Sequence, residues 1–500
     1  MNEAASFCVG SCGSSAISDI SINNNTKSLL QRDEQPNSDP DNSKMKGKGN
    51  INYPPYAINN NQPSHDIAEH GLSPNATHLD GTLEYDIHNL YGYTESKVTY
   101  DSLLEIIPYS SPNSITSSTS STSSKSKKQK RPFIISRSTH TGSGKYTGNW
   151  GGDNESTWKY MVFSISQAFQ FGQFGIPFFG VDACGFGGNS NEELCNRWMQ
   201  LASFFPFFRN HNALDAEPQE PYRWFSVARA TKRAMDVRYS LLPYYYTLLN
   251  EAHETGVPLL RATNWVFSNA KDLIGLDEQF FVGDGLIVVP GLEAGIDKVD
   301  GVFPGITNTE NEHREVYYDW YSHELLSVPD DYNNGSKSDH ITVDAPIGHI
   351  PLFVRGGYII PCQKPKMTVV ESRQTDFDLL IALNVNGTAK GELYLDDGET
   401  VNPEETLTVE FSIDTRNDKK TFMSKSKGKF YISERLNKVT ILGVDQFGGG
   451  EPTKVIFKER DSDFENFCLF EYVNGNLVIP NLQGFTDGGA FTEEFEISWS

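Results

Sequence analysis

The chain has 500 residues, enough for two to four domains with sizeable cores. It carries 42 basic and 65 acidic residues, a formal net charge of −23, so its surface repels nucleic acid and anionic membranes, and we expect neither as a partner. No stretch reaches the roughly 18 apolar residues of a membrane span. Aromatic residues make up 12% of the chain, which is typical either of sugar-stacking clefts or simply of large cores.

The first half of the chain predicts strands that alternate with helices. Residues 13–82 and 110–130 are low-complexity insertions rich in Ser, Asn, Asp and Pro, and between them helical spacing begins near residue 83. Further on, a strand is expected in "PFIISRST", a helix over 158–175, and a strand followed by a loop in "GIPFFGVDACGF". Next come a helix capped by Ser190 or Asn191, one or two helices over 222–255 with a break at Pro243, and a strand in "VPLLRAT". This alternation predicts a parallel sheet, most economically part of a (β/α)₈ barrel.

The second half predicts β-structure. After residue 265 strand-like segments dominate, and Gly, Asn and Asp separate them, which is typical of antiparallel β-sandwiches. We therefore expect a mixed α/β plus all-β chain with three parts. The parts are barrel segments over 1–265, a proximal sandwich over 266–362 and a distal sandwich over 363–500, with the second boundary near "PCQKP".

The cysteines and the glycosylation sequons favour an oxidising compartment. Cys8 and Cys12 lie close in sequence, as do Cys184 and Cys195, and Asn-x-Ser/Thr sequons begin at Asn24, Asn75, Asn154, Asn334 and Asn386. A metal site is the weaker explanation of the cysteines, because further paired Cys or His residues are missing near them. We expect no metal and no cofactor.

The segment "ISRSTHTGSGKYTGNWGGDNESTW" holds the most unusual candidate residue. Asp153 follows Trp150 and two glycines, and an aromatic neighbour that desolvates a carboxyl group raises its pKa, as a general acid requires. On spacing alone, an aspartate that forms a turn in "GGDN" is the commoner use of this pattern.

Several long motifs resemble glycoside hydrolase family 31, which contains the retaining α-glucosidases. They occur in the family's order: "EYDIHNLYGY", "RPFIISRSTHTGSGKYTGNWGGDN", "FGIPFFGVDACGF", "ELCNRWMQLASFFPFFRNHN", "SLLPYYYTLLNEAHETG", "IPLFVRGGYIIP" and "GELYLDDGET". The resemblance covers essentially the whole chain outside the low-complexity insertions. It implies the C-terminal half of a (β/α)₈ barrel followed by two β-sandwiches.

The resemblance assigns the catalytic residues. Asp153 matches the family's acid/base, whereas the nucleophile of the family is an Asp directly followed by Met-Asn-Glu, which matches the position before Met1. We therefore expect the chain to be part of a longer enzyme and to be inactive alone; the alternative is a deliberately shortened protein. Glu3 is expected either to have an electrostatic or positioning role or to form a salt bridge that holds its loop.

The resemblance also assigns the substrate-binding residues. Arg137 and His211 match residues that hydrogen-bond the sugar, and Trp150 and Phe186 match aromatic walls of the first subsite. Asp182 and Arg209 match a polar pair that either orients those residues or contacts the sugar. Met1 and Phe7 match positions beside the nucleophile. The implied disulfides are Cys184–Cys195 and Cys8–Cys12.

The expected function of the parent protein is hydrolysis of terminal α-1,4-linked glucose, and of α-1,6-linked glucose, in maltooligosaccharides and starch. Two alternatives stay open: an α-xylosidase or transglucosidase, and an inert fragment that at most binds carbohydrate. We expect the parent protein to be secreted or at the cell surface, although "MNEAASFCVG" lacks the basic residue and apolar run of a signal peptide.

Overall fold

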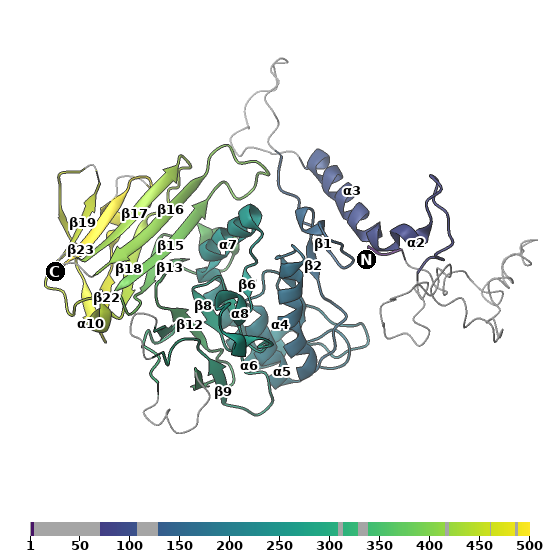
Figure 1. Ribbon diagram of the computed structural model, residues 1–500, viewed down its shortest axis with the longest axis horizontal. Helices are drawn as coiled ribbons and strands as arrows, with labels where there is room; N and C mark the ends of the chain where they lie inside the picture. Colours follow the sequence, from purple (N-terminus) through teal and green to yellow (C-terminus); the bar gives the residue numbers. More distant parts are fainter. Residues whose placement is uncertain are drawn as a thin grey trace, which may run out of the picture. The chain divides into compact units, whose positions relative to one another are not determined.

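The computed structural model describes residues 2–4, 71–107, 129–308, 314–328, 339–415, 420–460, 462–485 and 489–500. The chain (Figure 1) divides into two compact units. The first comprises Met1–Leu103 with Ile134–Thr147, and the second comprises Leu104–Phe133 with Gly148–Ser500. Among the described helices, none combines the length and apolar character needed to cross a membrane.

The first unit is mainly helical. The helical spacing expected from residue 83 is confirmed, with a tight turn in the middle: α2 (Glu84–Ile87), η2 (His88–Leu90) and α3 (Tyr91–Ile106) follow one another. The short β1 (Ile135–Ser136) and η3 (Ser143–Lys145) come later. The ring of Tyr146 meets Tyr93 and Tyr100 edge-on, with centroids 5.8 and 5.5 Å apart, and so ties the η3 loop to α3.

The second unit begins with short parallel strands and long helices, as the sequence predicts. Strand β2 pairs in parallel with β3, and β4 pairs in parallel with β5. The elements in chain order are β2 (Gly148–Trp150), α4 (Trp158–Gln173), β3 (Phe179–Gly180), β4 (Asp182–Ala183), α5 (Glu192–Ala202), β5 (Arg209–Asn210), η4 (Pro221–Arg223), α6 (Phe225–Ser240) and α7 (Leu242–Thr255).

Local capping sets the helix boundaries. Asn191 caps α5 by accepting a hydrogen bond from the backbone N–H of Leu194, which selects it over Ser190. Thr157 caps α4 in the same way through Tyr160. Pro243 lies in the first turn of α7, where no backbone N–H is needed, so the predicted break separates α6 from α7.

An antiparallel sheet follows, in the order β10-β12-β8-β7-β6, and β9 and β11 form a separate antiparallel pair. Its first strand precedes residue 265, because β6 already pairs with β7. The elements are β6 (Leu260–Arg261), α8 (Thr263–Val266), η5 (Lys271–Leu273), β7 (Phe280–Val282), β8 (Leu286–Val288), β9 (Lys298–Val302), β10 (Tyr317–Asp319), β11 (His340–Asp344) and β12 (Leu352–Arg355).

The C-terminal sheet has eleven strands in the order β20-β19-β23-β17-β16-β15-β13-β14-β18-β22-β21 (Figure 1). Most pairs are antiparallel, but β13–β15 and β14–β18 are parallel. The expected boundary at residue 362 falls within β13, which pairs with β14. Its strands are β13 (Tyr358–Gln363), β14 (Phe377–Ala382), β15 (Thr388–Leu395), β16 (Leu407–Asp414), β17 (Lys420–Gly428), β18 (Leu436–Leu442), β19 (Val455–Glu459), β20 (Asn466–Phe467), β21 (Glu471–Val473), β22 (Asn476–Ile479) and β23 (Phe495–Trp499). Three short helices lie between them, α9 (Val369–Arg373), α10 (Val444–Phe447) and η7 (Leu482–Gly484).

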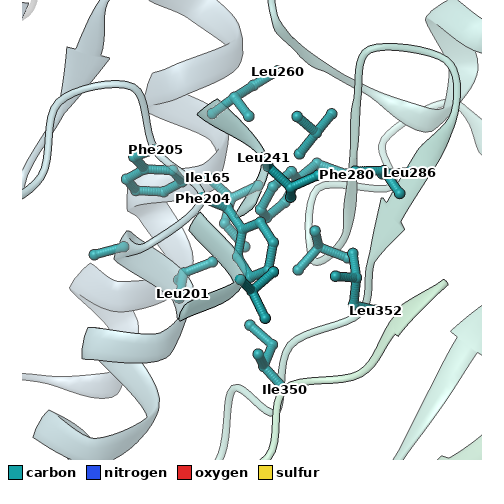
Figure 2. Close-up of a cluster of buried hydrophobic side chains, with 14 of the residues drawn as sticks. Ile165, Leu201, Phe204, Phe205, Leu241, Leu260, Phe280, Leu286, Ile350 and Leu352 are labelled. Carbon is teal, nitrogen blue, oxygen red and sulfur yellow. The ribbon is translucent and has the colours of Figure 1, made fainter. Parts of the chain in front are cut away.

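One hydrophobic core joins the helices to the first sheet. Figure 2 shows Phe204 and Leu241, from the helical part, packed with Phe280 and Leu352 of the sheet. Burial of this apolar surface, roughly 25 cal/mol per Å², fixes the short strands that few backbone hydrogen bonds could hold alone. A second core fills the eleven-stranded sheet around Phe411, Phe422 and Phe457.

Candidate functional site

The candidate residues of the second unit lie at the ends of the short parallel strands. Trp150 is the last residue of β2, and Asp182 of β4 is in register with Arg209 of β5. The backbone N–H of Gly151 donates to the carbonyl of Gly180 at 3.0 Å, which extends the β2–β3 pairing past Trp150. The carboxyl ends of parallel strands in a barrel lie on the same face, so side chains from segments that are far apart in sequence meet there.

Asp182, Trp150 and Arg209 form one hydrogen-bonded cluster. The Trp150 indole donates to Asp182 Oδ1 at 2.9 Å, and Arg209 donates to the same oxygen from Nε at 2.9 Å and from Nη2 at 2.7 Å. The Arg209 guanidinium also lies over the Trp150 ring, 4.5 Å from its centre. The pair that the sequence left as either orienting or substrate-contacting therefore holds the Trp150 ring in place.

The carboxyl group of Asp182 is buried. Its side chain has no exposed surface, and its Oδ2 has no hydrogen-bond partner among the residues that the structure describes. Burial raises the pKa of Asp182 above the ordinary value, although Arg209 and the Trp150 indole oppose that rise. The carboxylate is thus costly to ionise and needs the neighbouring guanidinium.

Asp153 lies in the loop that leaves β2. It is exposed and has a left-handed backbone with φ of 56°, which fits the turn predicted for "GGDN". Gly152 is required before it, because a Cβ there would lie 1.7 Å from the Trp150 ring. Asp153 therefore forms the turn and also carries an exposed carboxylate, so the turn and a chemical role are compatible.

Asn154 anchors this loop to the next one. It is 5% exposed, its side-chain amide donates to the Asp182 carbonyl at 3.0 Å, and its own carbonyl accepts hydrogen bonds from Phe186 and Gly187. Because this amide is buried and bonded, the sequon at Asn154 is not presented for glycosylation. Sequence reasoning treated Asn154 only as a sequon; its place beside Asp153 was the available signal for a positioning role.

Phe186 and His211 come together across two loops. Their ring centres are 5.4 Å apart, and Ala213 donates its N–H to the Phe186 carbonyl at 3.0 Å. The Cys184–Cys195 disulfide, expected from the resemblance, is confirmed and ties the Phe186 loop to α5. Buried Gln219 was missed: its amide donates to the Gly185 carbonyl at 2.7 Å, so it braces the same loop.

Arg137 and Glu3 form a pair in the first unit. Arg137 donates from Nε and Nη2 to the two Glu3 oxygens, at 2.7 and 3.1 Å, and both side chains are about one-third exposed. The side-chain oxygen of Asn2 accepts hydrogen bonds from the N–H groups of Arg137 and Ser138. The salt bridge that the sequence offered as one role for Glu3 is therefore present, while a catalytic role for Glu3 stays a prediction.

Four predicted residues, Met1, Phe7, Cys8 and Cys12, lie outside the described residues. Within the described ranges, no three or more His, Cys, Asp or Glu side chains are grouped so that they could hold a metal ion. Cys362 and Cys468 are both buried free thiols, and burial raises the pKa of Cys468 to about 11.

Family comparisons agree with the geometry of the strand ends. The model of the glycosyl hydrolases family 31 TIM-barrel domain matches residues 1–248, and the model of the family 31 C-terminal domain matches residues 256–360. The chain belongs to glycosyl hydrolase family 31. The TIM-barrel match covers the segments that carry Trp150, Asp153, Asp182 and Arg209, so these strand ends belong to the barrel domain of this family.

Individual relatives are similar over most or all of the chain. Glucoamylase 1 of Candida albicans is 47% identical over 532 aligned residues, covering 100% of this chain and 51% of that protein. An alpha-glucosidase of Aspergillus niger is 46% identical, covering 91% of this chain and 42% of its own length. The chain therefore spans about half the length of these relatives. Among solved structures, a Tris-bound glucosidase II alpha subunit superposes with a TM-score of 0.72 at 26% identity, covering 87% of this chain and 44% of that one.

Proposed function

We propose that this family 31 chain supplies the acid/base part of a retaining, exo-acting α-glucosidase. Its substrates are terminal α-1,4-linked, and also α-1,6-linked, glucose residues of maltooligosaccharides and starch. Family membership supports the reaction class, and the similarity to a glucoamylase and an alpha-glucosidase supports the substrate.

One observation carries the proposal: the loop that holds Asp153 begins directly after the fixed Trp150. The Trp150 ring is held by Asp182 and Arg209, and Asn154 ties the far side of the loop to the segment that follows β4. Asp153 is thus an exposed carboxylate, directly before the anchored Asn154, in a braced loop at the strand ends. Proton transfer requires a carboxyl group positioned in this way.

In the proposed reaction Asp153 donates a proton to the glycosidic oxygen while another carboxylate attacks the anomeric carbon. Asp153 then removes a proton from the water that releases the sugar. A retaining enzyme needs its two carboxyl groups about 5–5.5 Å apart. We assign the attack to the carboxylate that family members carry directly before the segment matched by Met1–Glu3.

The remaining side chains are assigned to sugar binding. The Phe186 ring suits the apolar C–H face of a pyranose, and His211 beside it supplies a hydrogen-bonding ring. Trp150 is 5% exposed and has the Arg209 guanidinium over its ring, so we assign it to supporting the subsite from behind. Arg137 is assigned to hydrogen-bonding the sugar, and its two hydrogen bonds to Glu3 orient the guanidinium.

We also propose an oxidising compartment or the cell exterior for the parent protein. The bridged Cys184–Cys195 pair and the exposed sequon residues Asn75 and Asn386 support this location. The sequons at Asn24 and Asn334 lie outside the described residues.

The acid/base role is tested in a hybrid, in which this chain replaces the matching stretch of the Candida albicans glucoamylase. Asp153→Asn removes the proton donor, so maltose hydrolysis should fall by about 10²–10⁴-fold. Hydrolysis of α-glucosyl fluoride should fall less in the first step, because fluoride leaves without protonation, and azide should restore the second step.

The matched control is Asp272→Asn, which changes an exposed aspartate in η5 away from the strand ends. It should leave both rates unchanged. Maltose hydrolysis at the unsubstituted rate by the Asp153 variant would refute the acid/base assignment.

A further inference from the structure

A groove of about 460 Å³ lies between α7, α9, the end of β15 and the segment 430–434, all in the second unit. None of its lining residues belongs to the candidate site at the barrel strand ends. Its volume falls within the roughly 300–1,000 Å³ of small-molecule sites. The residues that shape it are Tyr246, Tyr394, Tyr431, Phe430, Val370 and Arg373.

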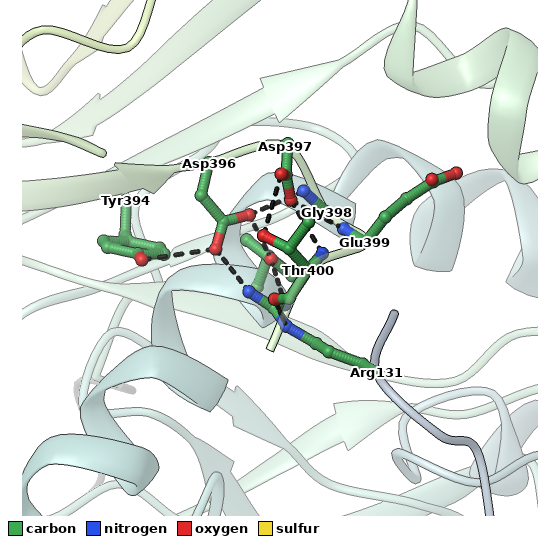
Figure 3. A network of polar contacts seen from close by, with 8 residues as sticks. Arg131, Tyr394, Asp396, Asp397, Gly398, Glu399 and Thr400 are labelled. Carbon is green, nitrogen blue, oxygen red and sulfur yellow. Dashed lines mark hydrogen bonds and ion pairs between the residues drawn. The ribbon is translucent and has the colours of Figure 1, made fainter. Parts of the chain in front are cut away.

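The floor of the groove is held by Asp396. This carboxylate accepts hydrogen bonds from Arg131 at 2.6 Å, from the Tyr394 hydroxyl at 3.2 Å and from the Tyr246 hydroxyl (Figure 3). Burial, reinforced by Asp396, raises the pKa of Tyr246 to about 12, so the phenol keeps its proton. The two tyrosine rings, 6.0 Å apart, are therefore fixed before any ligand arrives.

The walls of the groove expose apolar surface. The Tyr431 side chain is 63% exposed on one wall, and Val369 and Val370 of α9 are 43% and 66% exposed on the other. Helix α9 is short, but a capping box between Thr368 and Glu371 fixes its start. Both walls are thus ordered surfaces that present apolar groups to the groove.

Arg373 supplies unused donors beside these apolar groups. Its guanidinium lies 5.5 Å from the centre of the Tyr246 ring and packs on Gly398, where a Cβ would come within 2.6 Å of it. Gly398 has φ of 71° and is required there. Among the described residues, the guanidinium makes no hydrogen bond and no ion pair with a carboxylate. The guanidinium therefore lies beside the Tyr246 ring at the groove, with N–H donors that a ligand can use.

The charges in the groove select a neutral ligand. Asp396, Asp397, Glu399 and Glu434 line the groove with Arg373, but Arg131 pairs with Asp396 and Lys130 pairs with Glu399, so the charges nearly balance and favour neither an anion nor a cation. Asp397 is already used, because it accepts hydrogen bonds from the backbone of Glu399 and Thr400 and from the Thr400 hydroxyl. A ligand with apolar faces can pack against the tyrosine rings and the exposed valines, and its hydroxyl groups can accept hydrogen bonds from Arg373.

We propose that this groove is a second carbohydrate-binding site, which holds an α-glucan chain apart from the catalytic strand ends. The choice of an α-glucan rests on the proposed function, whereas the groove itself rests on the residues described above. A polymer held there would keep chain ends near the protein and raise their effective concentration.

The probe for the groove is β-cyclodextrin, a ring of α-1,4-linked glucose without a non-reducing end. An exo-acting site requires a free end, so calorimetric binding of this probe to the 500-residue chain reports the groove alone. Tyr431→Ala removes the exposed ring and Arg373→Gln removes the fork; each should weaken binding about fivefold or more. Both are exposed positions, and melting curves followed by circular dichroism should match those of the unsubstituted chain.

The matched control is Phe467→Ala, which removes a 68% exposed ring on β20 outside the groove. This variant should bind the probe normally. Absence of measurable cyclodextrin binding, or binding that neither groove variant weakens, would overturn the proposal. Equal binding of cellohexaose would overturn the choice of an α-linked glucan. Hydrolysis of maltose by the hybrid tests the proposed function separately, because it does not depend on this groove.

Discussion

At the residue scale, three segments of the second unit meet at the carboxylate of Asp182. One oxygen accepts hydrogen bonds from Trp150 and Arg209, which lie 32 residues before and 27 residues after it. The main chain of Asp182 also accepts the Asn154 amide. This single residue therefore orders both the Trp150 ring and the base of the Asp153 loop.

The raised pKa of Asp182 predicts how stability changes with pH. The folded chain keeps the proton on Asp182 at a higher pH than the unfolded chain does, where the ordinary value is 3.8. Stability of the unsubstituted chain relative to Asp182→Asn should therefore fall as pH rises above 3.8, and become constant above the folded pKa. Urea midpoints of both proteins between pH 4 and pH 7 measure the difference.

A difference that instead grows with pH would mean that Arg209 outweighs burial and lowers the pKa of Asp182. A second variant, Asp182→Ala, tests the contribution of the hydrogen bonds. It leaves the Trp150 and Arg209 donors without their acceptor, so it should lower the free energy of unfolding by about 1.5–3 kcal/mol at neutral pH.

At the element scale, the disulfide joins the segment after β4 to the first turn of α5. Cys184 and Cys195 are 11 residues apart, and the loop they close contains Phe186. Asn191 caps the same helix within that loop. Helix, cap and bridge together restrict how far Phe186 can move from His211.

Removing the bridge should loosen this element. In the chain-entropy model a loop of this length contributes about 3 kcal/mol to the free energy of unfolding, so Cys184→Ser with Cys195→Ser should lower the melting temperature. In the hybrid the change should also raise KM, because Phe186 is assigned to sugar binding. Dithiothreitol should shift the unsubstituted chain toward the variant and leave the variant unchanged. Peptide mapping that finds both thiols alkylated before reduction would contradict the bridge.

At the scale of the whole second unit, a strap connects distant parts of its sequence. Arg131 and Lys130 end the basic run "KSKKQKR", of which residues 125–128 lie outside the described residues. The Arg131 N–H donates to the Glu399 carbonyl, and the Val401 N–H donates to the Gln129 carbonyl, so residues 129–131 pair with the segment after Asp397. The described end of this basic run is bound by the buried carboxylate of Asp396.

The strap predicts unequal effects of two neighbouring substitutions. Arg131→Ala removes a charge-assisted hydrogen bond from a carboxylate with no exposed surface, and should lower the free energy of unfolding by about 1.5–3 kcal/mol. Lys130→Ala removes a 3.1 Å ion pair with a half-exposed Glu399 and should cost under about 1 kcal/mol. Urea midpoints at unchanged slope measure both, and equal effects would refute the strap.

Local signals in the sequence were sufficient for the helices and for the family. The Asn191 cap, the break at Pro243 and the helix from Trp158 depend on neighbours within about one turn, so the sequence carries them directly. The Cys184–Cys195 bridge and the barrel assignment came from motifs that match the family. By itself, then, the sequence determined where the helices between residues 158 and 255 lie, the family and the identities of the candidate residues.

Tertiary structure alone decided which of these residues meet and how. Asp182 and Arg209 become partners because β4 and β5 lie in register, and no periodicity in the sequence encodes that register. Asn154 is buried, so its sequon is not accessible for glycosylation. Arg131 contacts Asp396 although the two residues are 265 positions apart in sequence. The physical reason is the same in each case: packing of distant strands sets these contacts, and their energy comes from burial that a local segment cannot achieve.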